Sequence, residues 1–317
     1  MAVKFPKALK IVIPLFLGVA LVWYSFTIVP LNELLEYFEK ANYLYVALGL
    51  TFGLLSHLSR AYRWKFLIEP LGYSLRLPNS IMAVFSTYLI NYTIPRAGEV
   101  MRATILANYE GVPFEKGFGT IVSERIADLM VMLCIIAITL AIEFDFIYQF
   151  LIDRFDFGKL LGIGVLMLIM VLAVFFLLRK GKSKLAFKLR HFISGLIEGV
   201  LSILKMKRKG AFIFHTFFIW IMYLLMFYVT TFALPETSNL PVVAILIGFI
   251  AASFSIAATN GGIGSYPYAV YLAFSLFSIE KGPAIAIGTI IWSSQTLMII
   301  VLGGLSLIFL PIYNRTK

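Results

Sequence analysis

The chain has 317 residues, of which 61% are hydrophobic and 14% are charged. A soluble domain carries about 45–50% apolar and about 25% charged residues, so this composition excludes a water-soluble globular protein. The single cysteine, Cys134, excludes a disulfide framework and a thiolate metal site, and the three histidines have no metal-ligand spacing among the carboxylates. We therefore expect a membrane protein that has no metal and no cofactor.

Apolar runs bounded by charged residues, proline or glycine predict the membrane segments in chain order. The runs are 8–29, 42–59, 78–94, 100–109, 119–142, 158–178, 210–234, 241–258, 264–279 and 284–311. Three of them are too short to cross a membrane comfortably, since a crossing of about 30 Å needs about 20 residues. The pattern predicts an all-α polytopic membrane protein with about six transmembrane helices.

Basic residues set the orientation, because Lys and Arg are retained on the cytoplasmic side. In a single arrangement, most of the 27 Lys and Arg residues fall on one side of the membrane, including the N-terminal lysines, the basic run between Arg179 and Lys209, and Arg315. The opposite side receives mainly glutamate and aspartate. This predicts that both termini are cytoplasmic, and it accounts for the net charge of +11 without nucleic acid.

Two stretches have both ends on the same side of the membrane, and each contains two short apolar runs. Residues 78–110 have cytoplasmic ends and residues 241–279 have external ends. Each stretch predicts a re-entrant helical hairpin, and the two hairpins enter from opposite faces. With their flanking spans they form an inverted repeat, whose binding site is expected at the midplane between broken helices. The rival interpretation is two ordinary pairs of short, tilted spans, which would lack buried tips.

We interpret residues 1–317 as a single membrane domain. The first half covers 8–178 and the second half covers 210–311. Between them, apolar residues recur at helical spacing in 183–206, with lysine and arginine elsewhere on the helix. This predicts an amphipathic helix in the cytoplasmic interface, although a purely structural connector fits the pattern equally well.

The first hairpin tip carries charges that are costly in a membrane. Non-helical backbone at this depth survives only inside protein or beside a wet cavity. The return helix is expected to begin near Arg96 to Glu99 and to aim its N–H groups at that cavity, where Arg96 and Arg102 add positive charge. Phosphate is the favoured anion, because a guanidinium binds its oxygens two at a time. Alternatively, Glu99 neutralises both arginines and the group only braces the hairpin.

Further charged candidates flank this tip. Glu124 and Asp128 share a helix face, and Asp128 is expected to pair with an arginine, either as a fixed salt bridge or as a proton relay. Arg60 and Arg63 follow the span 42–59. They either draw anionic headgroups toward the hairpin or act as ordinary cytoplasmic anchors.

The second tip is uncharged and rich in glycine. Asn260 can cap a helix, while Gly261 and Gly262 let the backbone approach a ligand or the other tip closely. If the two tips meet, Ser265 and Tyr266 would offer hydroxyls to the same anion. Tight packing of a glycine-rich crossing explains these residues equally well.

These residues carry a family resemblance. The pattern Asn91-x-x-x-Pro95-Arg96-x-Gly98-Glu99-x-x-Arg102, followed by Glu124-Arg125 and Asp128, resembles the transmembrane region of the lysylphosphatidylglycerol synthase and flippase-like family of bacterial inner-membrane proteins. Arg60-x-x-Arg63-Trp64 and Asn260-Gly261-Gly262-Ile263-Gly264 are similar to its other signatures. The resemblance covers nearly the whole chain. Pro267 stands where the family signature has an acidic residue, which disfavours a titrating group at the second tip.

The resemblance and the residue patterns together define the candidate substrate-binding site. Its members are Arg60, Arg63, Asn91, Arg96, Glu99, Arg102, Glu124, Arg125, Asp128, Asn260, Gly261, Gly262, Ser265 and Tyr266. No catalytic or metal-binding residue is predicted.

The resemblance implies a non-enzymatic domain that moves lipid between the leaflets of a bacterial inner membrane. We expect a flippase-like transporter that carries an anionic or aminoacylated phospholipid, or a polyprenyl-phosphate lipid, through a midplane anion site. The sequence contains no aminoacyl-transferase domain like that of the bifunctional members, so a separate lipid-modifying synthase is a candidate partner. The alternative is a membrane-embedded enzyme acting on lipid-linked phosphate or sugar, with Glu99 or Asp128 as base.

Overall fold

A computed structural model describes residues 30–94, 96–144 and 206–315, together with isolated positions between 148 and 169. The expected first span and nearly all of the expected interfacial helix and of the span 158–178 lie outside the described residues. Within the described residues the regular structure is helical, which confirms an all-α protein. The chain divides into two compact units, residues 1–124 with 207–317 and residues 125–206. The packing described below is that of the first unit.

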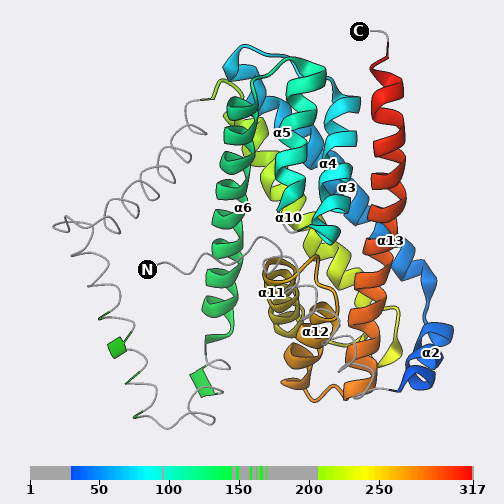
Figure 1. The fold of residues 1–317 in the computed structure, drawn as a ribbon. Helices are drawn as coiled ribbons and strands as arrows, with labels where there is room; N and C mark the ends of the chain where they lie inside the picture. Colours follow the sequence, from blue (N-terminus) through cyan, green and yellow to red (C-terminus); the bar gives the residue numbers. More distant parts are fainter. Residues whose placement is uncertain are drawn as a thin grey trace, which may run out of the picture. The chain divides into compact units, whose positions relative to one another are not determined.

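Both halves of the chain present the same order of helices, a long helix, two short helices and another long helix (Figure 1). The first half contains α2 (Leu31–Lys40), α3 (Tyr43–Ile68), the 3₁₀ turn η1 (Glu69–Leu71), α4 (Leu77–Thr93), α5 (Ala97–Glu110) and α6 (Phe114–Ile142). The second half contains α10 (Lys209–Thr231), the 3₁₀ turn η2 (Pro235–Thr237), α11 (Val242–Ala258), α12 (Ser265–Ser275) and α13 (Lys281–Tyr313).

Three described helices, α6, α10 and α13, are long and apolar enough to cross a membrane. Helices α2 and α3 meet the same criterion only as a pair bent by 86°. The chain is therefore a multi-pass membrane protein. The expected end of the second span, at residue 59, is too early, because α3 continues to Ile68. Arg60 and Arg63, which suggested a surface boundary, are buried inside the helix bundle.

The short helices form the two hairpins that the sequence predicts over 78–110 and 241–279. Helices α4 and α11 have 17 residues each, α5 has 14 and α12 has 11. At 1.5 Å per residue, α12 is about 17 Å long, well short of the roughly 30 Å of a bilayer core. Their re-entrant placement in a membrane remains a prediction that these lengths favour.

The two hairpins lie toward opposite ends of the long helices (Figure 1). Helix α13 packs against α4 with one part of its length and against α12 with another, while α3 packs along α10. Glycines sit at these crossings: a Cβ at Gly49 would meet Thr230 of α10, one at Gly303 would meet Phe85 of α4, and one at Gly288 would meet Pro267 of α12. Such small residues allow the close backbone approach on which helix packing in membranes depends.

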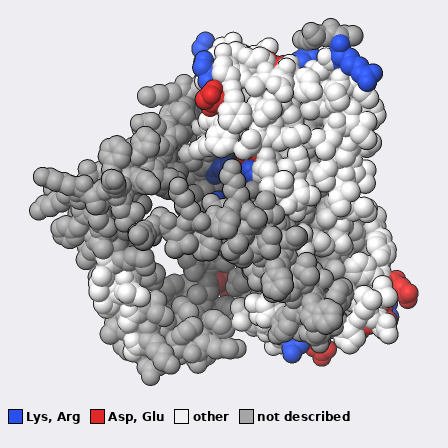
Figure 2. Space-filling view, viewed as in Figure 1, with Lys and Arg blue, Asp and Glu red and all other residues white. Residues whose placement is uncertain are grey.

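The surface of the described residues agrees with a membrane location. Figure 2 shows charged side chains toward two opposite ends of the white surface, with a broad uncharged area between them and a further basic group at its border with the grey region. Many large apolar side chains on the long helices are exposed, including Leu297, Ile308 and Phe309 of α13. Contiguous exposed apolar surface of this kind is expected where lipid rather than water is the solvent.

Candidate functional site

The first hairpin turns at Arg96, which adopts a left-handed conformation with φ 62° before α5 begins. The Asn91 side chain accepts a hydrogen bond from the Gly98 N–H at 2.9 Å, so a residue of α4 caps the free end of α5. A Cβ at Gly98 would overlap the Thr87 carbonyl. Glycine at 98 therefore permits the close contact between α4 and α5. The predicted start of the return helix is confirmed.

The second hairpin turns through three glycines with positive φ, Gly261, Gly262 and Gly264. Thr259 holds this turn, since its Oγ1 accepts from the Gly262 N–H at 3.2 Å and lies 2.8 Å from the Ser265 Oγ. The Ser265 hydroxyl is thus used inside the hairpin. The residue at the N-cap of α12 is Gly264 and not Asn260, so the predicted capping role of Asn260 is wrong.

The tips of the two hairpins meet. The Tyr92 ring of α4 lies so close to Gly261 that a Cβ on this residue would overlap the ring. The Tyr92 hydroxyl lies 3.1 Å from the Thr296 Oγ1, and the Trp292 Nε1 donates to the Gly261 carbonyl at 2.8 Å. Since Trp292 and Thr296 belong to α13, this helix holds both tips in place.

Behind the first tip, buried arginines of α3 and α5 converge on Glu124, in the first half of α6. The Arg102 Nη1 and Nη2 donate to the Glu124 Oε1 and Oε2 at 3.0 and 3.1 Å. The Arg60 Nη1 donates to Oε1 at 2.9 Å, and the Arg63 Nη2 lies 3.6 Å from it. All four side chains are at most 4% exposed. We call these four residues the arginine–glutamate cluster.

The helical positions explain why the cluster forms. Arg60, Arg63 and Trp64 share one face of α3 at the spacing i, i+3 and i+4. The guanidinium carbon of Arg102 lies 3.9 Å from the centroid of the Trp64 ring, whose Nε1 donates to the Thr120 Oγ1 at 2.9 Å. The Arg102 guanidinium is therefore held between an aromatic face and a carboxylate, an arrangement that favours arginine over lysine.

A further contact joins the cluster to the second half of the chain. The Arg63 Nη1 donates to the Thr216 Oγ1 on α10 at 2.8 Å, and the Arg63 guanidinium also lies 5.3 Å from the Phe212 ring centroid. The cluster thus ties together α3, α5, α6 and α10. The Arg102 Nε has no hydrogen-bond partner among the described residues. Ionic groups buried inside a membrane protein are costly and are usually functional.

Several predicted site residues do not take the roles that the sequence suggested. The Arg96 side chain is exposed, so Arg96 and Arg102 do not form a joint receptor at the tip. The carboxylate on Arg102 is Glu124 and not Glu99, which instead lies 3.4 Å from the Asn91 Nδ2. A carboxylate on a facing helix can approach the guanidinium group head-on and accept two hydrogen bonds from it. Glu99 lies on the same helix as Arg102 and would have to approach it from the side. Arg125 is exposed, Asp128 is buried, and both belong to the second compact unit.

At the second tip, Asn260 is 3% exposed, and neither its Oδ1 nor its Nδ2 has a hydrogen-bond partner among the described residues. Tyr266 is also buried, at 5% exposed. An orphaned buried amide is costly to keep and is rare in native structures, so the residue requires an explanation beyond packing.

Comparison with known proteins decides the family. Residues 11–304 match the lysylphosphatidylglycerol synthase TM region. The chain belongs to this family. The match covers most of the 317 residues and confirms the resemblance given by the sequence motifs. Membership in this family relates the chain to membrane proteins that act on lipids.

A curated relative is more distant. A UPF0104 membrane protein of Methanocaldococcus jannaschii is 29% identical over 136 residues, which are 42% of this chain and 40% of that protein. The chain therefore aligns with less than half the length of the relative. This similarity agrees with the assignment of the chain as a membrane protein, and it gives no information on activity or substrate.

In this member of the lysylphosphatidylglycerol synthase TM family, sequence analysis missed several supporting side chains. Trp64 lies inside a quoted motif, and its spacing from Arg60 is the signal that could have placed it beside the arginines. Thr216 had no such signal, because its role depends on how α10 packs against α3. Tyr92 and Trp292 were also missed, since contacts between two hairpin tips are set by tertiary packing.

Proposed function

We propose that this chain moves a phosphate-bearing lipid between the leaflets of a bacterial inner membrane, and that the phosphate passes through the arginine–glutamate cluster. The observation that carries the proposal is the bidentate pair of Arg102 and Glu124 at a buried position, with Arg60 and Arg63 on the same carboxylate. A carboxylate in this position presents the same pair of oxygens to a guanidinium as a phosphate does.

Glu124 therefore acts as an internal stand-in for the substrate. When a lipid phosphate arrives, it takes over one guanidinium while Glu124 keeps contact with the others, so no arginine is left in a low-dielectric site without an anion. Because several arginines share one carboxylate, the exchange can proceed one ion pair at a time. The lipid tails remain in the bilayer, because they gain nothing by moving from other lipid tails onto equally apolar helix surfaces.

The hairpin tips supply the barrier between the two sides. The contact of Tyr92 with Gly261 closes the path between the hairpins, and Asn260 beside it offers an amide donor and acceptor that a polar headgroup can use. An aminoacylated phosphatidylglycerol fits this pairing, because it combines a phosphate for the arginines with an ester and an ammonium for an amide. A polyprenyl phosphate shares only the phosphate.

The test is a translocation assay in proteoliposomes that contain a fluorescent phosphatidylglycerol, with chemical quenching from outside. Arg102→Lys keeps the charge but loses the bidentate fork and the fit to Trp64, so we expect the rate to fall about tenfold or more, or ~1.4 kcal/mol. The control is Arg315→Lys, the same substitution at an exposed position that follows α13. An unchanged rate for Arg102→Lys would remove the cluster from the transport path.

A second readout separates transport from chemistry. Lipid extracts of cells with and without the protein should contain the same lipid species, with a changed distribution between the leaflets. A new or missing lipid species would favour the membrane-embedded enzyme instead.

A further inference from the structure

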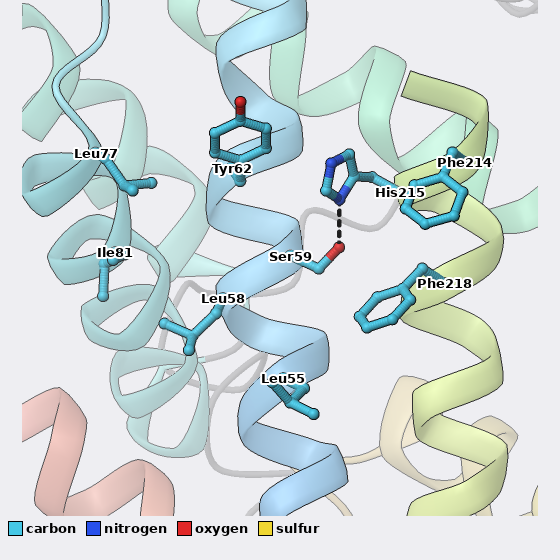
Figure 3. Close-up of a pocket in the computed structure, with 9 residues that line it drawn as sticks. All are labelled: Leu55, Leu58, Ser59, Tyr62, Leu77, Ile81, Phe214, His215 and Phe218. Carbon is cyan, nitrogen blue, oxygen red and sulfur yellow. Dashed lines mark hydrogen bonds between the residues drawn. The ribbon is translucent and has the colours of Figure 1, made fainter. Parts of the chain in front are cut away.

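A groove of about 370 Å³ lies between α3, α4 and α10 (Figure 3). Its apolar wall includes Leu55, Leu58, Ile81 and Phe218. No residue of this wall belongs to the predicted substrate site. The groove extends along α3 from Tyr62 to Leu55, eight residues or about 10 Å of helix.

The groove contains one polar pair. The Ser59 Oγ lies 2.8 Å from the His215 Nδ1, which joins α3 to α10 across the groove (Figure 3). In the tautomer in which Ser59 donates to Nδ1, the other ring nitrogen of His215 carries the proton and is a donor. The His215 ring also packs against Tyr62, at 5.1 Å between centroids. A donor in an otherwise apolar groove marks the place for an acceptor oxygen.

One end of the groove is basic. The Lys65 Nζ lies 5.4 Å from the Tyr62 ring centroid, and α10 begins at Lys209, preceded by Lys207 and Arg208. The start of α10 lies beside the end of α3, since Arg208 forms an ion pair with Glu69. Along its length the groove therefore presents the positive charge of Lys65, then the hydrogen-bond donor of His215, and then the apolar wall.

This order is the order of groups in a glycerophospholipid. We propose that the groove binds one acyl chain of an anionic glycerophospholipid, with an ester carbonyl at His215 and the headgroup at Lys65. Burying a chain gives little preference by itself in a membrane, because the surrounding tails are as apolar as leucine. The preference for this lipid over others comes from the basic end, because its positive charge attracts an anionic headgroup more strongly than a zwitterionic one.

The proposal extends the proposed function by placing a lipid beside the arginines that would receive it. Ser59 and Arg60 are neighbours on α3, as are His215 and Thr216 on α10, and Thr216 is the residue that accepts from Arg63. A lipid seated in the groove would therefore contact residues that directly precede Arg60 and Thr216 in the chain. The groove is proposed to bind lipid, and binding can be measured whether or not the protein translocates lipid.

The experiment is photo-crosslinking in proteoliposomes of phosphatidylcholine that contain a phosphatidylglycerol with a diazirine in one acyl chain. Labelled peptides are quantified by mass spectrometry. We expect the groove segments of α3 and α10 to be labelled several-fold more than the lipid-exposed residues Leu297 and Ile308 of α13. The same probe built on phosphatidylcholine should label the groove several-fold less.

Variants complete the test. Leu58→Trp fills the groove and should reduce its labelling several-fold, whereas Leu48→Trp, an exposed position of α3 that does not line the groove, should not. If Leu58→Trp fails to fold, Phe218→Trp fills the same space from α10. Equal labelling of the groove and α13, no effect of filling, or equal labelling by both headgroups would each overturn the proposal. Loss of translocation with groove labelling intact would contradict only the proposed function.

Discussion

At the scale of single residues, the protein is defined by charges kept away from water. Arg102 and Glu124 form a two-point ion pair, and the flat face of Trp64 covers the guanidinium. Sequence could show that arginines and carboxylates occur in apolar surroundings. It could not show which carboxylate pairs with which arginine, because the spacing in the sequence allows both Glu99 and Glu124. Only the packing of α5 against α6 determines that Arg102 pairs with Glu124.

Removal of Glu124 tests how far the fold depends on this pair. Glu124→Ala leaves the buried Arg102 guanidinium without its two-point carboxylate partner, so we expect a loss of about 3–5 kcal/mol in the free energy of unfolding. Denaturant or thermal unfolding in detergent measures it. Glu115→Ala, an exposed glutamate on the same helix, is the control and should change stability by less than about 0.5 kcal/mol. A loss in Glu124→Ala no larger than in the control would show that the pair is not structurally important.

At the scale of helices, the hairpins were the most predictable part of the fold. Their observed limits, Leu77 to Glu110 and Val242 to Ser275, lie close to the predicted ones, because proline, glycine and the sidedness of basic residues mark the breaks. The end of α3 was less predictable. Arg60 and Arg63 look like surface anchors in the sequence, and only a partner on another helix makes their burial tolerable.

The contact between the hairpin tips can be tested with a matched pair of glycines. Gly261 and Gly72 both have positive φ, so alanine costs about 1–2 kcal/mol of backbone strain at either position. Only at Gly261 would the new Cβ also overlap a ring, that of Tyr92, whereas nothing lies within 4 Å of the Cβ at Gly72. We expect Gly261→Ala to lower the melting temperature more than Gly72→Ala and to separate the tips.

A double variant separates the overlap from the backbone strain. In Gly261→Ala with Tyr92→Ala the overlap is gone, so the melting temperature should fall by less than the sum of the falls in the two single variants. Equal melting temperatures for Gly261→Ala and Gly72→Ala would contradict the tight tip contact.

At the scale of the whole molecule, the repeated order of helices places one hairpin toward each end of the long helices. An inverted repeat of this kind requires that both ends of each hairpin return to the side from which it entered. The sequence predicts this sidedness from its basic residues, and the described helices have lengths that suit it.

Cysteine labelling assigns the sides. In a Cys134→Ser background, Ser74→Cys and Glu115→Cys flank the first hairpin, and Asn239→Cys and Glu280→Cys flank the second, all at exposed positions. In intact bacterial cells permeable only at the outer membrane, a membrane-impermeant maleimide should label the second pair and should reach the first pair only after lysis. Labelling of one member of a pair without the other would instead show a full crossing between them.

The central claim is that the arginine–glutamate cluster receives a lipid phosphate and is more than a brace. Arg102→Met leaves Glu124 in contact with Arg60 and Arg63, so the buried carboxylate keeps cationic partners and the protein should still fold. The decisive measurement is the rate at which this variant moves fluorescent phosphatidylglycerol across proteoliposomes. We predict a folded protein whose rate is at most about a tenth of the wild-type rate. A folded Arg102→Met variant that moves the lipid at the wild-type rate would contradict this claim.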